Sequence, residues 1–343
     1  MKRVMYSKSP DARAAFVRRF FANCGAERIF YLTPKKFMED VASRLPEASL
    51  FPFEDVTKSN DLFNEAGDDV LLVFDRASRY KNITSNTFVR LSRIAAKYRH
   101  KALVDIVPFT SGIEYLYSPL AFIDRDILGY QHWYSFRENN WELGQNGERV
   151  RAHDFEWLAK KLSYHVEIDY DSFLGSQLEI IDCPLTREEA AEYKMLRDKL
   201  FEENRSANPI ITTLADWTNI RESRYAVLEE ILCRPGRMIV YTNLLGHNKR
   251  LRKRFPGVEV RSFYDANGGE DVYDRVILFE APIVKGYLFL DVIANVRSNC
   301  EILVFRSDTT VDRLLFKRLF DEYQALNDFC KVLYKEVHNE ARG

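Results

Sequence analysis

Short runs of consecutive apolar residues recur along the first third of the chain, and most are followed by segments with helical periodicity. The runs are Val4–Tyr6, Ile29–Leu32, Val70–Phe74 and Ala102–Val107. Consecutive apolar positions rich in β-branched and aromatic residues are typical of strands that are covered on both faces. Helical patterns lie between them, notably Asp11–Asn23, which Ser9 and Pro10 can begin, and Thr87–Lys97. The alternation predicts a parallel sheet flanked by helices.

The last third of the chain repeats this alternation. Apolar runs typical of buried strands are followed by segments with helical spacing. The predicted strands are Met238–Tyr241, Val258–Val260, Val276–Phe279 and Ile302–Phe305. The predicted helices are Leu244–Phe255, Val284–Val296 and Thr310–Leu333.

Between these two parts the strand-like runs become rare and the polar fraction rises. Leu185–Asn204 and Ile220–Leu232 have the spacing of amphipathic helices. Thr186 and Glu189 form the sequence pattern of a capping box at the start of the first of them. We therefore expect a first α/β lobe over residues 1–130, a mainly helical connector over 131–235 and a second α/β lobe over 236–343.

The composition supports a folded protein without an overall nucleic-acid signature. The chain has 343 residues, room for about two domains, and 46% of them are hydrophobic. The 50 Lys and Arg residues are balanced by 51 Asp and Glu residues, so any basic surface must be local. No apolar run approaches the length of a membrane span and the start has no secretion signal, so we expect a soluble intracellular protein, cytoplasmic with a nuclear location also open.

Metal and nucleophile chemistry find no support in the sequence. The five cysteines are scattered with no CxxC pair, which predicts reduced thiols rather than zinc ligands or disulfides. The six histidines show no HxH or HxxxH spacing, and no Gly-x-Ser-x-Gly motif is present. We expect no metal and no cofactor.

Several stretches are informative through their order. LLVFDRASRYKN (Leu71–Asn82) looks like an Asp-Glu-Ala-His segment, and KALVDIVPFTSGIEYLYSPLAFIDRDILG, which follows, looks like a strand ending in Thr-Gly-Thr-Pro with a Glu-Leu-Tyr helix. CPLTREEAAEYKMLRDKL, MIVYTN, the Gly268-Gly269 turn, VILFEAP and EILVFRSDTTVDRLLFKRL come later. In this order and spacing they resemble the Swi/Snf-type ATPases of helicase superfamily two. The resemblance covers nearly the whole chain and implies two RecA-like lobes that bind ATP and track DNA.

The sequence departs from that family where the family holds its nucleotide. The Gly-Lys-Thr loop, whose amides and lysine cradle phosphates, is replaced by SKSPDARAAF, which has no glycine, although Lys8 and Arg13 are nearby. Asp75 stands at the magnesium position, but Arg76 replaces the glutamate that orients the attacking water. Asp105 begins the stretch that replaces Thr-Gly-Thr-Pro, and Arg297 is the one arginine left in the last motif. The resemblance thus predicts a vestigial nucleotide site of Lys8, Arg13, Asp75, Arg76, Asp105 and Arg297, without ATPase activity.

These residues also have simpler interpretations. Asp75 can cap the turn that follows its strand. Arg76 can form an ion pair with Asp105 across adjacent strand ends. Arg297 can be a surface or lobe-interface residue.

The densest basic segment is HNKRLRKRF, His247–Phe255. It is predicted to lie on a helix, and such a cluster can neutralise phosphates or form a solvated helix face. A second basic group is equally ambiguous, and the aromatic stretch Tyr130–Trp141 can either stack on bases or pack in a core. The candidate nucleic-acid contacts are Lys249, Arg250, Arg252, Lys253 and Arg254, and the second group is Arg90, Arg93, Lys97, Arg99 and Lys101.

Three functional hypotheses follow from the resemblance and its gaps. The first is a catalytically inactive helicase-like protein that binds or positions DNA in a replication, recombination or transcription assembly, such as that of a virus or mobile element. The second is a scaffold that binds a protein partner and whose nucleotide cleft is filled. The third is a residual ATP-dependent translocase, supported only by Asp75 and Arg297.

Overall fold

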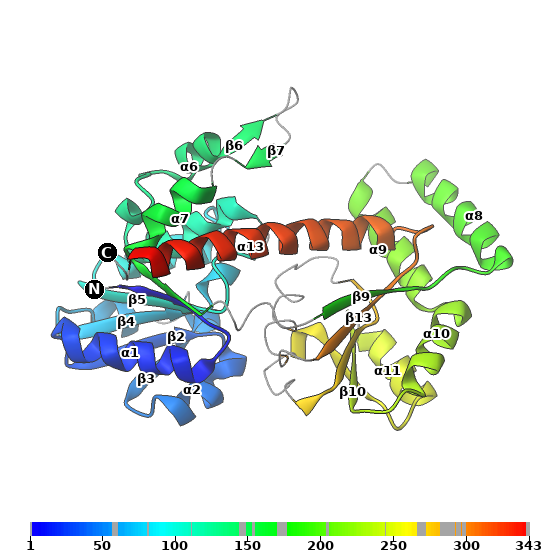
Figure 1. Cartoon of the computed structure of the whole chain (residues 1–343), viewed down its shortest axis with the longest axis horizontal. Helices are drawn as coiled ribbons and strands as arrows, with labels where there is room; N and C mark the ends of the chain where they lie inside the picture. The colour runs from blue at the N-terminus through cyan, green and yellow to red at the C-terminus, as the bar shows by residue number, and fades with distance from the viewer. Residues whose placement is uncertain are drawn as a thin grey trace. The chain divides into compact units, whose positions relative to one another are not determined.

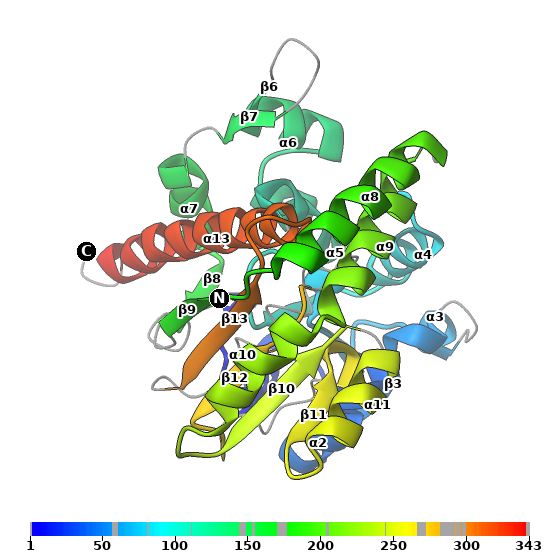
Figure 2. The ribbon, with the colours of Figure 1, turned by 90° about the vertical axis from the view of Figure 1, so that its right-hand side faces the viewer.

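The protein is described by a computed structural model that comprises two compact units (Figures 1 and 2). Unit 1 contains residues 1–174 and 324–343, and unit 2 contains residues 175–323. The structure describes residues 2–56, 61–80, 82–110, 112–143, 149–152, 155–169, 177–203, 206–243, 245–265, 272–281, 292, 296 and 300–340.

Unit 1 is built on a six-stranded parallel sheet with the strand order β3-β2-β4-β5-β1-β8. The strands are β1 (Val4–Tyr6), β2 (Arg28–Thr33), β3 (Ala48–Pro52), β4 (Val70–Asp75), β5 (His100–Asp105) and β8 (Val166–Ile168). The helices are α1 (Pro10–Cys24), α2 (Met38–Arg44), α3 (Asp61–Asn64), α4 (Asn86–Ala95), α5 (Tyr117–Ile123), α6 (Trp133–Asn140) and α7 (Phe155–Ser163). An antiparallel pair, β6 (Trp141–Leu143) with β7 (Arg149–Ala152), follows α6.

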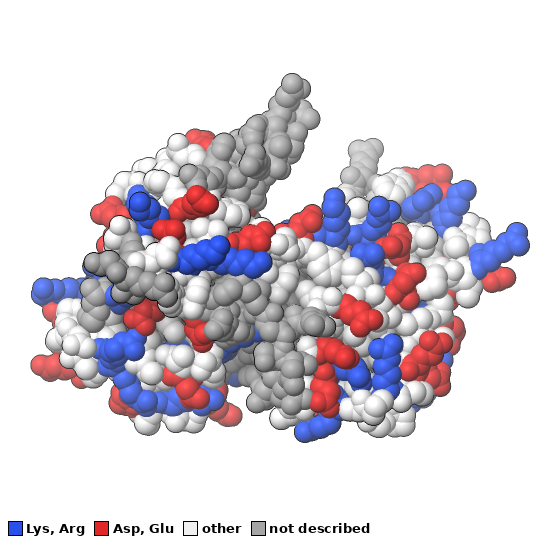
Figure 3. Space-filling model, viewed as in Figure 1, with Lys and Arg blue, Asp and Glu red and all other residues white. Residues whose placement is uncertain are grey.

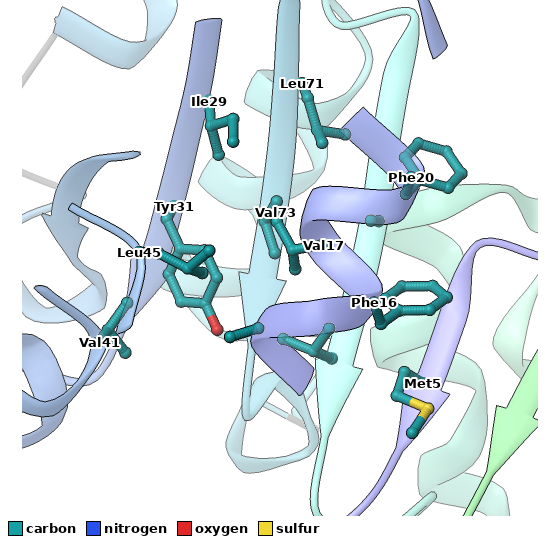
Figure 4. Packing of buried hydrophobic residues seen from close by; sticks show 13 residues of the cluster. Met5, Phe16, Val17, Phe20, Ile29, Tyr31, Val41, Leu45, Leu71 and Val73 are labelled. Carbon is teal, nitrogen blue, oxygen red and sulfur yellow. The ribbon is translucent and has the colours of Figure 1, made fainter. Parts of the chain in front are cut away.

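Helix α1 supplies much of the core on one face of this sheet. Its apolar residues Phe16, Val17 and Phe20 pack against strand residues such as Leu71 and Val73 (Figure 4). The helix begins as the sequence predicts, because the Ser9 hydroxyl accepts a hydrogen bond from the amide of Ala12 and a proline occupies the first turn.

The end of the chain returns to unit 1. Helix α13 (Asp312–Glu340) begins in unit 2, and its residues from Gln324 onward belong to unit 1. The buried ring of Phe329 lies 5.6 Å from that of Phe109 and 5.8 Å from that of Phe155, measured between centroids. The core of unit 1 is therefore completed by residues far away in the sequence.

Unit 2 has a five-stranded parallel sheet with the order β11-β10-β12-β13-β9. Its strands are β9 (Gln177–Asp182), β10 (Met238–Thr242), β11 (Glu259–Ser262), β12 (Arg275–Leu278) and β13 (Glu301–Arg306). Helices α8 (Arg187–Glu203), α9 (Ala207–Asn219), α10 (Glu222–Leu232) and α11 (Leu245–Arg254) accompany it.

Short 3-10 helices occur in both units. Those of unit 1 lie at Lys35–Phe37, Phe53–Asp55, Ala77–Arg79, Ile113–Leu116 and Arg125–Ile127, and unit 2 has one at Phe263–Asp265.

The predicted fold class is confirmed: each unit is a parallel sheet flanked by helices. All eight predicted strands are strands, and the capping box forms, with the amide of Thr186 donating to Glu189 at 2.9 Å and the amide of Glu189 donating to the Thr186 hydroxyl at 3.2 Å. The predicted helix Val284–Val296 and the Gly268-Gly269 turn lie almost wholly outside the described residues.

The segment 131–235, expected to be a separate helical connector, is divided between the two units. It gives β8 to the first sheet and β9 to the second, and its helices α8 to α10 belong to unit 2. The sequence did not indicate β8 and β9 because they are edge strands. Each is paired on one side only, and edge strands carry more polar residues than central ones.

Candidate functional site

The strand order of unit 1 gathers polar residues at the carboxyl edge of its sheet. Neighbouring strands β2, β4, β5, β1 and β8 end at or next to Thr33, Asp75, Asp105, Ser7 and Asp169. This edge is where open α/β sheets bind ligands. The Ser7 hydroxyl donates to the Asp169 carboxylate at 3.1 Å, which links the ends of β1 and β8.

Arg13 occupies the middle of this edge. It extends from the first turn of α1 and is 4% exposed, and its guanidinium donates to the carbonyls of Ser7 at 2.6 Å and Lys8 at 3.0 Å. Its Nε lies 4.0 Å from Oδ1 of Asp75, which is 1% exposed. The other carboxylate oxygen of Asp75 accepts a hydrogen bond from the Thr33 hydroxyl at 2.8 Å. An internal cation thus compensates the buried charge of Asp75.

The connection from β1 to α1 is short, and the amides of Ser7 and Ser9 in it donate to oxygens of the protein itself. Only Ser7, Lys8 and Ser9 lie between the last strand residue and the first helical residue. The amide of Ser9 donates to the Ser7 hydroxyl at 3.0 Å, and the amide of Ala12 donates to Ser9. A phosphate-binding loop instead spaces two glycines ahead of its helix and directs free amides at the anion. Here carbonyl oxygens meet a guanidinium at the corresponding place.

Lys8 is the remaining cation of this loop. Its side chain is largely buried, and burial lowers the pKa of its ammonium group to about 8. With this pKa the group still carries its proton in about nine molecules out of ten at pH 7, so Lys8 remains a cation near neutral pH.

Asp105 binds the turn that follows the neighbouring strand. Its carboxylate accepts hydrogen bonds from the amide of Ser78 at 2.9 Å and from the amide of Ile106 at 2.7 Å. The turn after β4 is therefore bound by Asp105, whereas Asp75, expected to cap it, faces Thr33 and Arg13. Burial, reinforced by the nearby charge of Asp75, raises the pKa of Asp105 to about 6 in spite of the two amide bonds.

The raised pKa of Asp105 predicts a pH dependence of stability. The folded state keeps this proton up to about pH 6, whereas the unfolded chain releases it near pH 3.8. The unfolding free energy should therefore fall as the pH rises through this window, by up to about 3 kcal/mol. Urea unfolding of the wild type and of Asp105→Asn between pH 4 and 7 measures this, because the variant lacks the titrating group. Parallel pH curves for the two proteins would contradict the prediction.

Arg76 adopts an unusual backbone conformation. It is buried, has φ 57° and ψ 37°, and its guanidinium lies 3.6 Å from the centroid of the Phe37 ring. A left-handed backbone conformation is uncommon for residues other than glycine. The amide of Arg76 donates a hydrogen bond to the carbonyl of Val104 at 2.9 Å, which holds Arg76 in this conformation. The ion pair of Arg76 with Asp105 stays a prediction, and Arg297 lies outside the described residues.

The basic helix of unit 2 is α11, and its five candidate cations are not equivalent. Arg252 donates twice to the carbonyl of Val260, at 3.2 and 2.7 Å. Arg254 makes two bonds to the carboxylate of Glu222, at 2.8 and 2.7 Å. Lys249, Arg250 and Lys253 are exposed, and the described structure gives them no hydrogen bond or ion pair. Three of the five predicted contacts are therefore available to a ligand.

The start of α11 is fixed by a buried polar cluster that the sequence did not reveal. Glu280, next to the end of β12, accepts a hydrogen bond from the amide of Asn243 at 2.7 Å and contacts Nδ1 of His247. Burial alone would lower the pKa of His247, but the hydrogen bond and the charge of Glu280 raise it. This cluster joins the ends of β10 and β12 to the helix that carries the three exposed cations.

The second basic group does not form one surface of free cations. Arg93 is exposed, but Arg99 lies 3.9 Å from Asp68, and burial lowers the pKa of Lys101. On the face that Figure 3 shows, basic and acidic side chains are interspersed, as the near-zero net charge implies.

The sequence also did not reveal several partners of the buried charged residues, because these contacts depend on the order of the strands in each sheet. Thr33 and Ser78 bind the two buried carboxylates, and Arg224 forms a buried ion pair with Asp312 in unit 2. The position of Thr33, directly after the apolar run Ile29–Leu32, was a usable signal. Among the described residues no group of three or more His, Cys, Asp or Glu side chains has an arrangement that could hold a metal ion.

Comparison with known proteins gives likenesses of fold. No known family profile matches the chain, and no curated protein matches it. The Sulfolobus solfataricus SWI2/SNF2 ATPase core in complex with dsDNA is 14% identical, with 95% of this chain and 88% of that chain covered and a TM-score of 0.42. The Pyrococcus furiosus Hef helicase domain is 12% identical, with 92% and 94% covered and a TM-score of 0.44.

A variant of S. cerevisiae Dbp5 bound to RNA and ADP BeF3 is also similar, with 11% identity, 98% and 89% of the two chains covered and a TM-score of 0.42. The chain is thus similar in fold to SWI2/SNF2 ATPase cores and to other helicases. At this identity the likeness concerns the fold alone.

No helix in the described part of the chain is long and apolar enough to cross a membrane.

Proposed function

We propose that this chain is a catalytically silent helicase-like protein that binds nucleic acid through α11 and acts as a positioning subunit of a larger assembly. The main support for the lack of ATPase activity is the position of Arg13. Its guanidinium lies between the carbonyls of the β1–α1 connection and the carboxylate of Asp75. A nucleotide phosphate needs amide donors here, and magnesium needs a free Asp75.

Removing this arrangement to admit a nucleotide would be costly. Moving Arg13 away would leave the carbonyls of Ser7 and Lys8 without their donor, and a buried polar group without a partner costs about 1–3 kcal/mol. The three-residue connection would also have to lengthen before its amides could surround a phosphate. Arg76 also argues against hydrolysis, because a cation cannot act as the base that orients the attacking water.

The test of the silent part is nucleotide binding and hydrolysis by the full chain. We expect no heat of binding for ATP or ADP with magnesium in calorimetry, and no hydrolysis with or without DNA. Asp75→Ala and Arg13→Ala, checked for folding by circular dichroism, should behave in the same way. Robust hydrolysis by the wild type that Asp75→Ala abolishes would refute the proposal and favour a residual translocase.

The nucleic-acid part rests on Lys249, Arg250 and Lys253, which adjoin one another on one face of α11 at spacings of one, three and four residues. Three cations on one helix face can neutralise neighbouring phosphates. A wild type that binds neither nucleotide nor nucleic acid, but copurifies with a defined protein, would favour the scaffold function instead.

A further inference from the structure

An exposed aromatic surface in unit 1 lies around α6 and α7. The large aromatic side chains that are exposed in the described structure are Tyr134, Trp157, Tyr164, Phe201 and Tyr264. Three of these five lie between residues 134 and 164, with exposed fractions of 59% for Tyr134, 45% for Trp157 and 61% for Tyr164. Exposed aromatic side chains that adjoin one another in space mark interaction sites, whereas isolated ones are ordinary surface.

The rings around α7 form one half of this surface. The ring of Trp157 meets that of Tyr130 edge-on, with 6.4 Å between centroids. Lys161, one turn after Trp157, places its ammonium group 4.9 Å from the Trp157 ring and donates to the carbonyl of Leu128 at 2.9 Å. Both the cation and the rings are therefore held in place before any ligand arrives.

The rings of α6 form the other half in the same way. Trp133 donates its indole N–H to the carbonyl of Glu114 at 3.1 Å, which fixes the ring. Tyr134 packs edge-on against it at 5.1 Å and remains exposed, and the guanidinium of Arg137 lies 5.4 Å from the Trp133 ring. The contact of Tyr130 with Trp157 connects the segment before α6 to α7.

We propose that this surface, made of Tyr130, Trp133, Tyr134 and Trp157 with the cations Arg137 and Lys161, binds the unpaired bases of a single-stranded nucleic acid. This rests on the proposed function, and it adds a second mode of binding to the charge-based one of α11. The exposed rings of Tyr134 and Trp157 each offer a face for one base, the half-buried rings of Tyr130 and Trp133 support them, and the nearby cations offer partners for phosphates.

The charge of the surface favours stacking as the main source of affinity. Helices α6 and α7 carry the cations Arg137, Lys160 and Lys161 and the acids Glu138 and Glu156, so the local excess of positive charge is small. Phosphate tracking needs a strongly basic surface, whereas stacking on aromatic rings depends little on charge. Binding here should therefore be much less sensitive to salt than binding at α11.

The experiment compares wild type, Trp157→Ala, Trp157→Phe and Tyr264→Ala for binding to a labelled oligothymidylate of about 16 nucleotides. Trp157→Ala should weaken binding by about 5- to 150-fold, equally at low and moderate salt. Trp157→Phe should keep most of the affinity, and Tyr264→Ala, an exposed ring in unit 2, should change nothing. An abasic oligonucleotide of the same length should bind the wild type at least as weakly as oligothymidylate binds Trp157→Ala, because it can stack on none of the rings.

Two results would overturn the inference: unchanged affinity in Trp157→Ala, or an abasic strand that binds as tightly as oligothymidylate. Binding of blunt duplex DNA separates this from the proposed function. If duplex binding persists while Trp157→Ala has no effect on single strands, the stacking surface is wrong and the proposed function stands. If the wild type binds no nucleic acid of either form, both are wrong.

Discussion

Replacing Lys249, Arg250 and Lys253 together with glutamine should weaken duplex DNA binding about 100-fold at 0.15 M salt. Each cation that contacts one phosphate contributes about 0.9 to the slope of log affinity against log salt concentration. Three contacts contribute about 2.7 to that slope, which gives the expected loss. Titrations of a labelled duplex at several salt concentrations measure the affinity and the slope together.

The matched control lies on the same helix. Arg252→Gln with Arg254→Gln removes two positive charges, but both side chains are already bound, to Val260 and Glu222. This variant should lose some stability and keep a slope close to that of the wild type. If instead the slope falls in proportion to the number of charges removed in both variants, α11 acts only through its total charge, and the distinction between its bonded and unbonded cations is wrong.

The sequence predicted the central strands well because burial on both faces leaves a local signal. Val70–Phe74 and Ile302–Phe305 are uninterrupted apolar runs, and both lie inside their sheets. Edge strand β3 (Ala48–Pro52) is interrupted by Ser49 and ends in a proline, and it was not predicted. A weak local pattern becomes a strand there because β2 offers a hydrogen-bonding edge, which is tertiary information.

The contacts of the candidate residues could not be read from the sequence. Asp75 directly follows the predicted strand Val70–Phe74, whereas Asp105 lies inside the predicted strand Ala102–Val107. In the structure they end β4 and β5, at the carboxyl edge of the sheet. The sequence does not reveal that Arg13 reaches from α1 to Asp75, because that contact depends on the strand order that brings β1 close to β4. Likewise, nothing in the local sequence shows that Arg252 is hydrogen-bonded to the carbonyl of Val260 while its neighbour Lys253 is not.

Asp312→Ala should lower the unfolding free energy of unit 2 by about 3–5 kcal/mol, because it leaves a buried arginine without its counter-ion. The guanidinium of Arg224 is buried and donates to Oδ2 of Asp312 at 2.6 Å. It also donates to the carbonyls of Phe279 at 3.0 Å and Phe305 at 2.9 Å. Urea unfolding of the full chain, followed by probes in unit 2, measures the loss. Glu222→Ala, which removes the partner of Arg254 at the surface, should cost at most about 1 kcal/mol.

The double variant Arg224→Met with Asp312→Leu separates the ion pair from the carbonyl contacts. If the pair acted alone, replacing both charges by apolar side chains would restore most of the stability that Asp312→Ala loses. Since Arg224 also binds the carbonyls of Phe279 and Phe305, at the ends of β12 and β13, the double variant leaves these acceptors without a donor. We therefore expect a residual loss of about 1–3 kcal/mol. Full recovery would show that the carbonyl bonds contribute nothing and that Arg224 serves Asp312 alone.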